Sequence, residues 1–84
     1  MAIRVFIADD HAVFRNGLRI LLEKEKDIEV VGETGSGHDT LQALDSCKAD
    51  VLLLDINMPG LSGNRVAEEL LKKRPAPAIV VLTM

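Results

Sequence analysis

The chain has 84 residues, 48% of them hydrophobic, and a formal net charge of −3 at pH 7. This length allows one small domain, and the apolar fraction is enough for a globular core, which argues against a disordered chain. The basic residues are scattered, so the charge pattern gives no indication of nucleic-acid binding. A single cysteine, Cys47, excludes an internal disulfide and is typical of a reducing compartment.

The sequence shows no sign of a membrane segment or of a secretory signal peptide. No apolar run approaches the roughly 20 residues that a membrane-spanning helix needs. The N-terminal stretch MAIRVFIADD meets charged residues too early for a signal peptide. These observations predict a cytoplasmic protein without membrane contact.

Four short apolar segments are predicted to form strands. Residues 3–8 are β-branched and apolar, and residues 28–33 form a second strand whose polar ends suit the edge of a sheet. Residues 51–54 and 78–82 are apolar without alternation, which is typical of parallel strands buried on both faces.

Three amphipathic helices are expected between these strands. Ser36 and Asp39 suit a capping box before the second helix, Ser62 is a candidate N-cap for the third, and Pro75 ends the third. The apolar positions on the inner faces are Phe14, Leu18, Leu21 and Leu22; Thr40, Leu41, Leu44 and Cys47; and Val66, Ala67 and Leu70.

The order β-α-β-α-β-α-β predicts an α/β fold with a parallel sheet and helices on both faces. In such sheets, functional sites lie at the carboxyl ends of the strands. Asp9 and Asp10 follow the first strand, Asp55 ends the third, and Thr83 ends the fourth. We therefore expect three carboxylates and a hydroxyl to meet at one edge of the sheet.

Three carboxylates in one place indicate a metal site that is suited to phosphoryl transfer. At an effective dielectric constant of about 20, two like charges 4–5 Å apart repel by about 3–4 kcal/mol. Mg²⁺ removes this repulsion, and a carboxylate beside it can attack a phosphoryl group. A nearby hydroxyl can hydrogen-bond one of the phosphoryl oxygens. One such aspartate alone would be an ordinary turn former or helix cap, and His11 and His38 are interpreted as polar surface residues.

The aspartate pair, the segment LLLDINMPGLSG and the ending VVLT resemble the receiver domain of bacterial two-component response regulators. The opening DDHAVFRNGLRILLE, with the later EVVGE, resembles the subfamily that carries a C-terminal helix-turn-helix output domain. The resemblance covers nearly the whole chain. It implies a flavodoxin-like, doubly wound sheet with the strand order 2-1-3-4.

The resemblance implies a phosphorelay module that regulates transcription, not an enzyme. Asp55 would accept a phosphoryl group from the phosphohistidine of a sensor histidine kinase. Asp10 would ligate Mg²⁺ together with Asp55 and the backbone carbonyl of Asn57, and Asp9 would act mainly through water. Thr83 would be the switch hydroxyl. The output domain would bind DNA, and this chain itself would not.

The family pattern has five strand–helix units, whereas the sequence ends after the fourth strand. We therefore expect a C-terminally truncated, partial receiver domain over residues 1–84, which lacks the fifth strand, the last two helices and the lysine that would pair with the phosphoryl group. Phosphorylation of such a chain is expected to be impaired. The unpaired edge of strand 78–82, with exposed Val80, Val81 and Leu82, is expected to mediate self-association.

Two other functions stay open at this stage. A haloacid-dehalogenase-like aspartyl phosphatase also has a nucleophilic aspartate at a strand end. In that family the nucleophile belongs to an Asp-x-Asp motif on the first strand. This chain instead has Asp55-Ile56-Asn57 on the third strand. A non-phosphorylated interaction domain usually lacks one of the acids, and all three are present.

Overall fold

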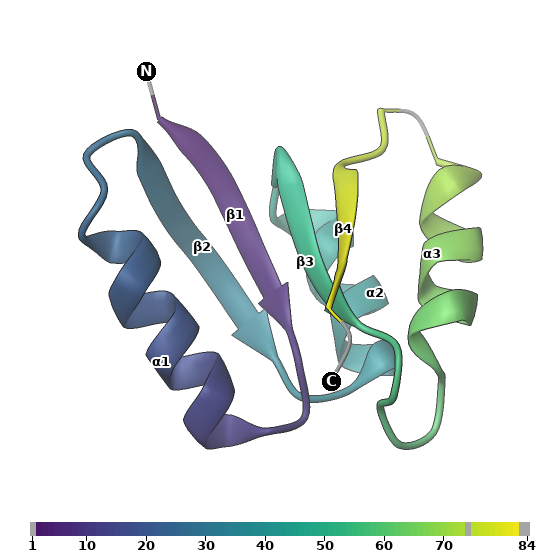
Figure 1. Ribbon diagram of the computed structural model, residues 1–84. Coiled ribbons are helices and arrows are strands. Elements are labelled where there is room, and N and C mark those ends of the chain that lie inside the picture. Colours follow the sequence, from purple (N-terminus) through teal and green to yellow (C-terminus); the bar gives the residue numbers. More distant parts are fainter. Residues whose placement is uncertain (1, 74, 83–84) are drawn as a thin grey trace.

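The computed structural model describes residues 2–73 and 75–82. Its strands form one parallel sheet in the order β2-β1-β3-β4, which confirms the predicted fold class (Figure 1). The elements follow one another as β1 (Ile3–Ala8), α1 (Ala12–Glu23), β2 (Ile28–Thr34), α2 (Gly37–Ser46), β3 (Val51–Asp55), α3 (Gly63–Leu71) and β4 (Ala78–Leu82).

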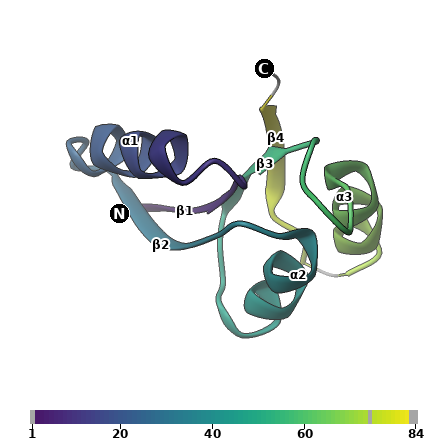
Figure 2. The ribbon, with the colours of Figure 1, turned by 90° about the horizontal axis from the view of Figure 1, so that it is seen from below.

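Helices cover both faces of the sheet. Helix α1 lies on one face, and α2 and α3 lie on the other, as the view from below shows (Figure 2). The main core lies between the sheet and helices α2 and α3, because alternate side chains of β1 and β3 point to that face. Its buried members are Phe6, Ala8, Leu52, Leu54, Met58, Val66 and Leu70.

Helix α1 is packed more loosely than the sequence pattern predicts. None of its residues is buried, and Phe14, Leu18 and Leu22 are only half-buried. Arg15 and Arg19 of this helix form ion pairs with Glu33 of β2. The prediction for Leu21 was wrong, because this side chain is 61% exposed. Leu21 is at i+3 from Leu18 and borders the same face, so its exposure shows that the sheet leaves this border of the helix uncovered. No helix in the described ranges has the length and apolar character needed to cross a membrane.

The helix ends agree only partly with the predicted caps. Ser36 accepts a hydrogen bond from the backbone N–H of Asp39 at 3.1 Å, as expected for an N-cap. Ser62 holds the N-cap position of α3, but its side chain makes no capping bond. The first N–H of that helix, on Gly63, is instead satisfied by the carbonyl of Ile56 at 2.9 Å. Cys47 is the C-cap of α2 and has extended backbone, so it does not lie on the helix face.

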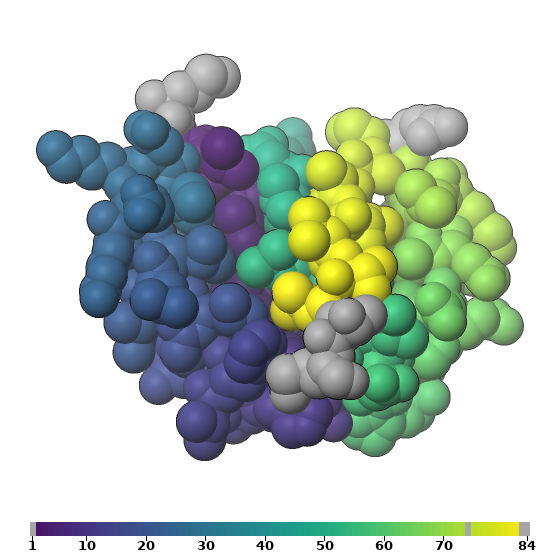
Figure 3. All heavy atoms as spheres, in the orientation of Figure 1, coloured from purple at the N-terminus to yellow at the C-terminus, as the bar shows by residue number. Residues whose placement is uncertain are grey.

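Strand β4 forms one edge of the sheet, opposite to β2. Val80 and Val81 are each 48% exposed, and in Figure 3 the side chains of β4 lie open on the face of the molecule. Ile79 packs against the main core. The expected exposure of β4 is therefore confirmed for the two valines, whereas Leu82 is half-buried.

Candidate functional site

The three predicted acids meet at the carboxyl edge of the sheet. Strands β1 and β3 are parallel neighbours, and Ala8 lies beside Leu54, so the residues that follow come close together. Asp9, Asp10, His11 and Asp55 each offer a ligand atom, and these four atoms all lie within 4.8 Å of one another. We call these four residues the acidic cluster. It lies at the lower edge of the sheet in Figure 1, and Figure 2 looks onto that edge.

The acidic cluster combines buried and accessible carboxylates. Asp9 is 1% exposed and Asp55 is 4% exposed, whereas Asp10 faces solvent. Asp55 Oδ1 accepts a hydrogen bond from the backbone N–H of Asn57 at 3.0 Å. Asp9 Oδ2 is buried and has no hydrogen-bond donor within the described ranges. A desolvated carboxylate oxygen without a donor is costly, and a hard cation bound by oxygen ligands removes that cost. The donor set therefore fits Mg²⁺.

His11 belongs to this group, although the sequence pattern predicts only a polar surface residue there. His11 occupies the N-cap position of α1, and therefore Asp10 is not the N-cap of this helix. The side chain of His11 makes no capping hydrogen bond. Its Nδ1 lies 3.1 Å from Asp9 Oδ1, 3.1 Å from Asp10 Oδ1 and 3.9 Å from Asp55 Oδ2. Its backbone N–H donates to Asp9 Oδ1 at 2.7 Å. The position of His11 directly after the aspartate pair is the feature of the sequence that could have indicated its place in the cluster.

The segment after Asp55 has a buried anchor and an exposed turn. Met58 is part of the main core. Asn57 is exposed, and Gly60 has a φ of 77°, a left-handed conformation that glycine adopts without strain. The ligand role of the Asn57 carbonyl stays a prediction. Thr83, the predicted switch hydroxyl, lies outside the described residues.

Arg15, on α1, forms hydrogen bonds to the residue that follows β1 and to β2. Its Nη1 donates to the backbone carbonyl of Asp9 at 2.5 Å, and its Nε donates to Glu33 Oε1 at 3.0 Å. The side chain is 20% exposed. Arg15 thereby links α1 to the end of β1 and to β2. The sequence pattern gives no indication of this link, because it joins residues that are distant along the chain.

Replacing Arg15 by methionine is expected to lower the free energy of unfolding by about 2 kcal/mol. The change keeps an apolar stem but leaves the Asp9 carbonyl without its charged donor, and such hydrogen bonds contribute about 1.5–3 kcal/mol. Arg65→Met is the matched control. Among the described residues, Arg65 forms an ion pair only with Glu68, at 4.0 Å on the exposed surface of α3. This variant is expected to change stability by less than about 0.5 kcal/mol. Equal urea midpoints for the two variants would contradict the structural role of Arg15.

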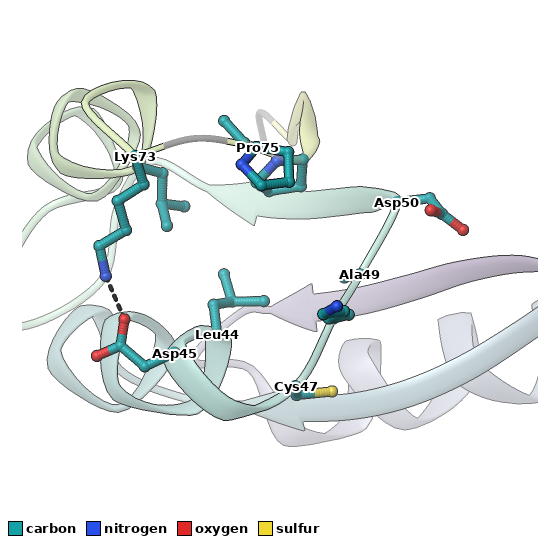
Figure 4. A pocket seen from close by; sticks show the side chains of 11 residues that line it. Leu44, Asp45, Cys47, Ala49, Asp50, Lys73 and Pro75 are labelled. Atoms are coloured by element: carbon teal, nitrogen blue, oxygen red, sulfur yellow. Dashed lines mark hydrogen bonds and ion pairs between the residues drawn. The ribbon is translucent and has the colours of Figure 1, made fainter.

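A cavity of about 410 Å³ lies at the other edge of the sheet, where β3 and β4 begin. Leu44, Ala49 and Leu70 are among its lining residues. An ion pair between Lys73, which follows the C-cap of α3, and Asp45 of α2 crosses beside it (Figure 4). None of the acidic cluster lines this cavity, so the two features occupy opposite ends of the strands.

Comparisons with known proteins agree with this geometry. The sequence profile of the response regulator receiver domain matches residues 5–84. The uncharacterized transcriptional regulatory protein YhcZ of Bacillus subtilis is 39% identical over 80 residues, which are 95% of this chain and 37% of that protein. The chain thus spans well under half of the length of this curated relative.

Solved structures show the same fold. The signal receiver domain of the putative response regulator NarL from Mycobacterium tuberculosis has a TM-score of 0.89 and 32% identity, and the match covers 95% of this chain and 64% of that one. RcsB from Salmonella enterica serovar Typhimurium, bound to promoter P1flhDC in the presence of the phosphomimetic BeF3-, has a TM-score of 0.90 and 33% identity. That match covers 100% of this chain and 42% of RcsB. The fold, the position of the acids and the profile match agree: this chain belongs to the response regulator receiver domain family.

Proposed function

We propose that Asp55 is the phosphoacceptor of a phosphorelay. An oxygen of its carboxylate attacks the phosphorus of a sensor kinase phosphohistidine, the N–P bond breaks, and the phosphoryl group remains on Asp55 as an acyl phosphate. The observation that carries the proposal is the position of Asp55, at the end of the central strand β3 and within 4.8 Å of three other ligand atoms. Membership of the receiver family favours this function over a haloacid-dehalogenase-like phosphatase.

We further propose that the site uses Mg²⁺, which neutralises charge on the transferring oxygens when it is bound. Asp10, which is accessible, ligates the ion directly together with Asp55 and the backbone carbonyl of Asn57. Asp9, which is buried behind them, acts mainly through water. Thr83 is the proposed switch hydroxyl. The chain takes part in its own phosphoryl transfer and dephosphorylation in this proposal.

The proposed partners follow from the relatives. A cytoplasmic sensor kinase domain supplies the phosphoryl group, and an output domain beyond the present sequence carries the DNA contact, as the promoter-bound RcsB structure suggests by analogy. This chain itself makes no DNA contact in this proposal, because its basic residues are scattered and its net charge is −3. Self-association through β4 stays a prediction. Its support is the exposure of Val80 and Val81, and sedimentation of the 84-residue chain would measure it.

Phosphorylation by a small phosphodonor tests the role of Asp55. The chain is incubated with acetyl phosphate and Mg²⁺, and the intact mass is measured. We expect partial addition of a single phosphoryl group to the wild-type chain, because its phosphorylation is expected to be impaired. We expect no addition to Asp55→Asn, and none to the wild type when a chelator replaces Mg²⁺. Asp27→Asn is the control, because Asp27 is exposed and far from the acids in the sequence. Equal phosphorylation of Asp55→Asn and the wild type would refute the proposal.

A further inference from the structure

The imidazole of His11 gives the acidic cluster a nitrogen donor that the carboxylates lack. Nδ1 lies 3.1 Å from one oxygen of Asp9 and 3.1 Å from one oxygen of Asp10. Adjacent ligand atoms in an octahedral shell with bonds of about 2.1 Å are about 3 Å apart. The separation between Nδ1 and Asp10 Oδ1, the proposed direct ligand, is therefore that of neighbouring ligands around one small dication, and Nδ1 lies 3.9 Å from Asp55 Oδ2.

A second feature of the cluster also indicates a bound cation. Asp9 is 1% exposed, and its Oδ2 has no donor among the residues that the structure describes. The hydrogen bonds from His11 reach the other oxygen, Oδ1, and leave Oδ2 unsatisfied. A buried carboxylate oxygen without a donor is uncommon in folded proteins and calls for a partner that these residues do not supply.

We propose that His11 is a ligand of the cation site and makes this site prefer first-row transition dications to Mg²⁺. The inference rests on the proposed function, because it concerns the same site. Carboxylate and water ligands suit Mg²⁺, whereas an imidazole nitrogen suits Co²⁺, Ni²⁺ and Zn²⁺ and adds little for Mg²⁺. In the metal-free chain Nδ1–H donates to Asp9 Oδ1 at 3.1 Å. Ligation of the ion requires the tautomer with the proton on Nε2 instead, and the ring is half-exposed at the N-cap of α1.

Binding of Co²⁺ and Mg²⁺, measured separately by titration calorimetry, tests this role. The variants His11→Gln and His11→Asn remove the nitrogen donor, and asparagine is also a favoured N-cap, which protects the fold. We expect Co²⁺ affinity to fall at least about tenfold in both variants, since even an outer-shell partner is worth about 10–100-fold in metal affinity. Mg²⁺ affinity is expected to stay within about twofold of the wild type.

The visible absorption of bound Co²⁺ separates ligation from positioning. We expect the bands of the wild-type complex to shift in both His11 variants, because an oxygen donor replaces nitrogen. His38→Gln is the matched control, since His38 is the other histidine of the chain and lies outside the cluster. It is expected to change neither the affinity nor the spectrum.

The outcomes distinguish this inference from the proposed function. Unchanged Co²⁺ affinity and an unchanged spectrum in the His11 variants would overturn the ligand role of His11 alone, provided that Asp10→Asn still abolishes Mg²⁺ binding. Unchanged Mg²⁺ binding in Asp10→Asn would show that the acids are not the cation site, and both proposals would then fail.

Discussion

Gly63→Ala is expected to lower the free energy of unfolding by about 3 kcal/mol, which is a large part of the stability of a small domain. A Cβ atom at this position would overlap the carbonyl oxygen of Asp55 and would lie 2.6 Å from the Cα of Ile56. Both are backbone atoms, so no side-chain rotation relieves the clash. The start of α3 would have to move away from the end of β3, and the phosphoacceptor strand would lose its support.

Gly17→Ala is the matched control for that prediction. Gly17 lies inside α1, and a methyl group added there would point into open space, with no neighbouring atom within 4 Å. Alanine is expected to raise the free energy of unfolding there by about 0.5–1 kcal/mol, because it restricts the unfolded chain and favours the helix. Urea unfolding followed by far-UV circular dichroism measures both variants, since the chain has no Trp or Tyr. Similar midpoints for the two variants would contradict the close approach at Gly63.

Asp9→Asn is expected to have opposite effects in the absence and presence of Mg²⁺. Without the ion, the variant should be more stable by about 2 kcal/mol. The substitution removes a buried charge that repels two nearby carboxylates, and one such pair costs about 3–4 kcal/mol at an effective dielectric constant of about 20. The asparagine oxygen can still accept the hydrogen bond that the backbone N–H of His11 donates to Asp9.

With Mg²⁺ the order is expected to reverse, so that the wild type becomes slightly more stable than the variant. An ion at about 100 times its dissociation constant stabilises the native state by about 2.7 kcal/mol. Asp9→Asn weakens binding of the ion and should lose most of this gain, whereas Asp27→Asn, on the surface, should keep it. Urea midpoints of the wild type and the two variants, each with Mg²⁺ and with a chelator, measure the six cases. A metal-free Asp9→Asn variant that is less stable than the wild type would show that repulsion between the carboxylates does not govern the stability of the metal-free chain.

The sequence was sufficient to predict the order of the elements and the meeting of the acids. Strand β4 has the predicted bounds, 78–82, because an apolar run after a proline-rich turn has few alternatives. The acids could be placed because topology alone brings the ends of neighbouring parallel strands together. Neither inference needed the position of any single side chain.

Side-chain geometry was beyond the reach of the sequence pattern. Leu21 fits an apolar helical face by spacing, yet the packing of α1 on the sheet leaves it exposed. The roles of His11 and Arg15 depend on rotamers and on the turn after β1, which periodicity does not encode. The requirement for glycine at position 63 arises from the distance between α3 and β3. That distance is a property of the folded chain and not of the local sequence.

The opposite placement of the cavity and the acids has a practical consequence. Cys47, the single cysteine of the chain, lines the cavity at the amino end of β3 and is partly accessible. A thiol-specific fluorophore attached there would sit a full strand length from the aspartates and would leave the cation and phosphoryl chemistry untouched. It would also supply the optical signal that a chain without Trp or Tyr lacks, so folding and ligand binding could be followed in the same sample.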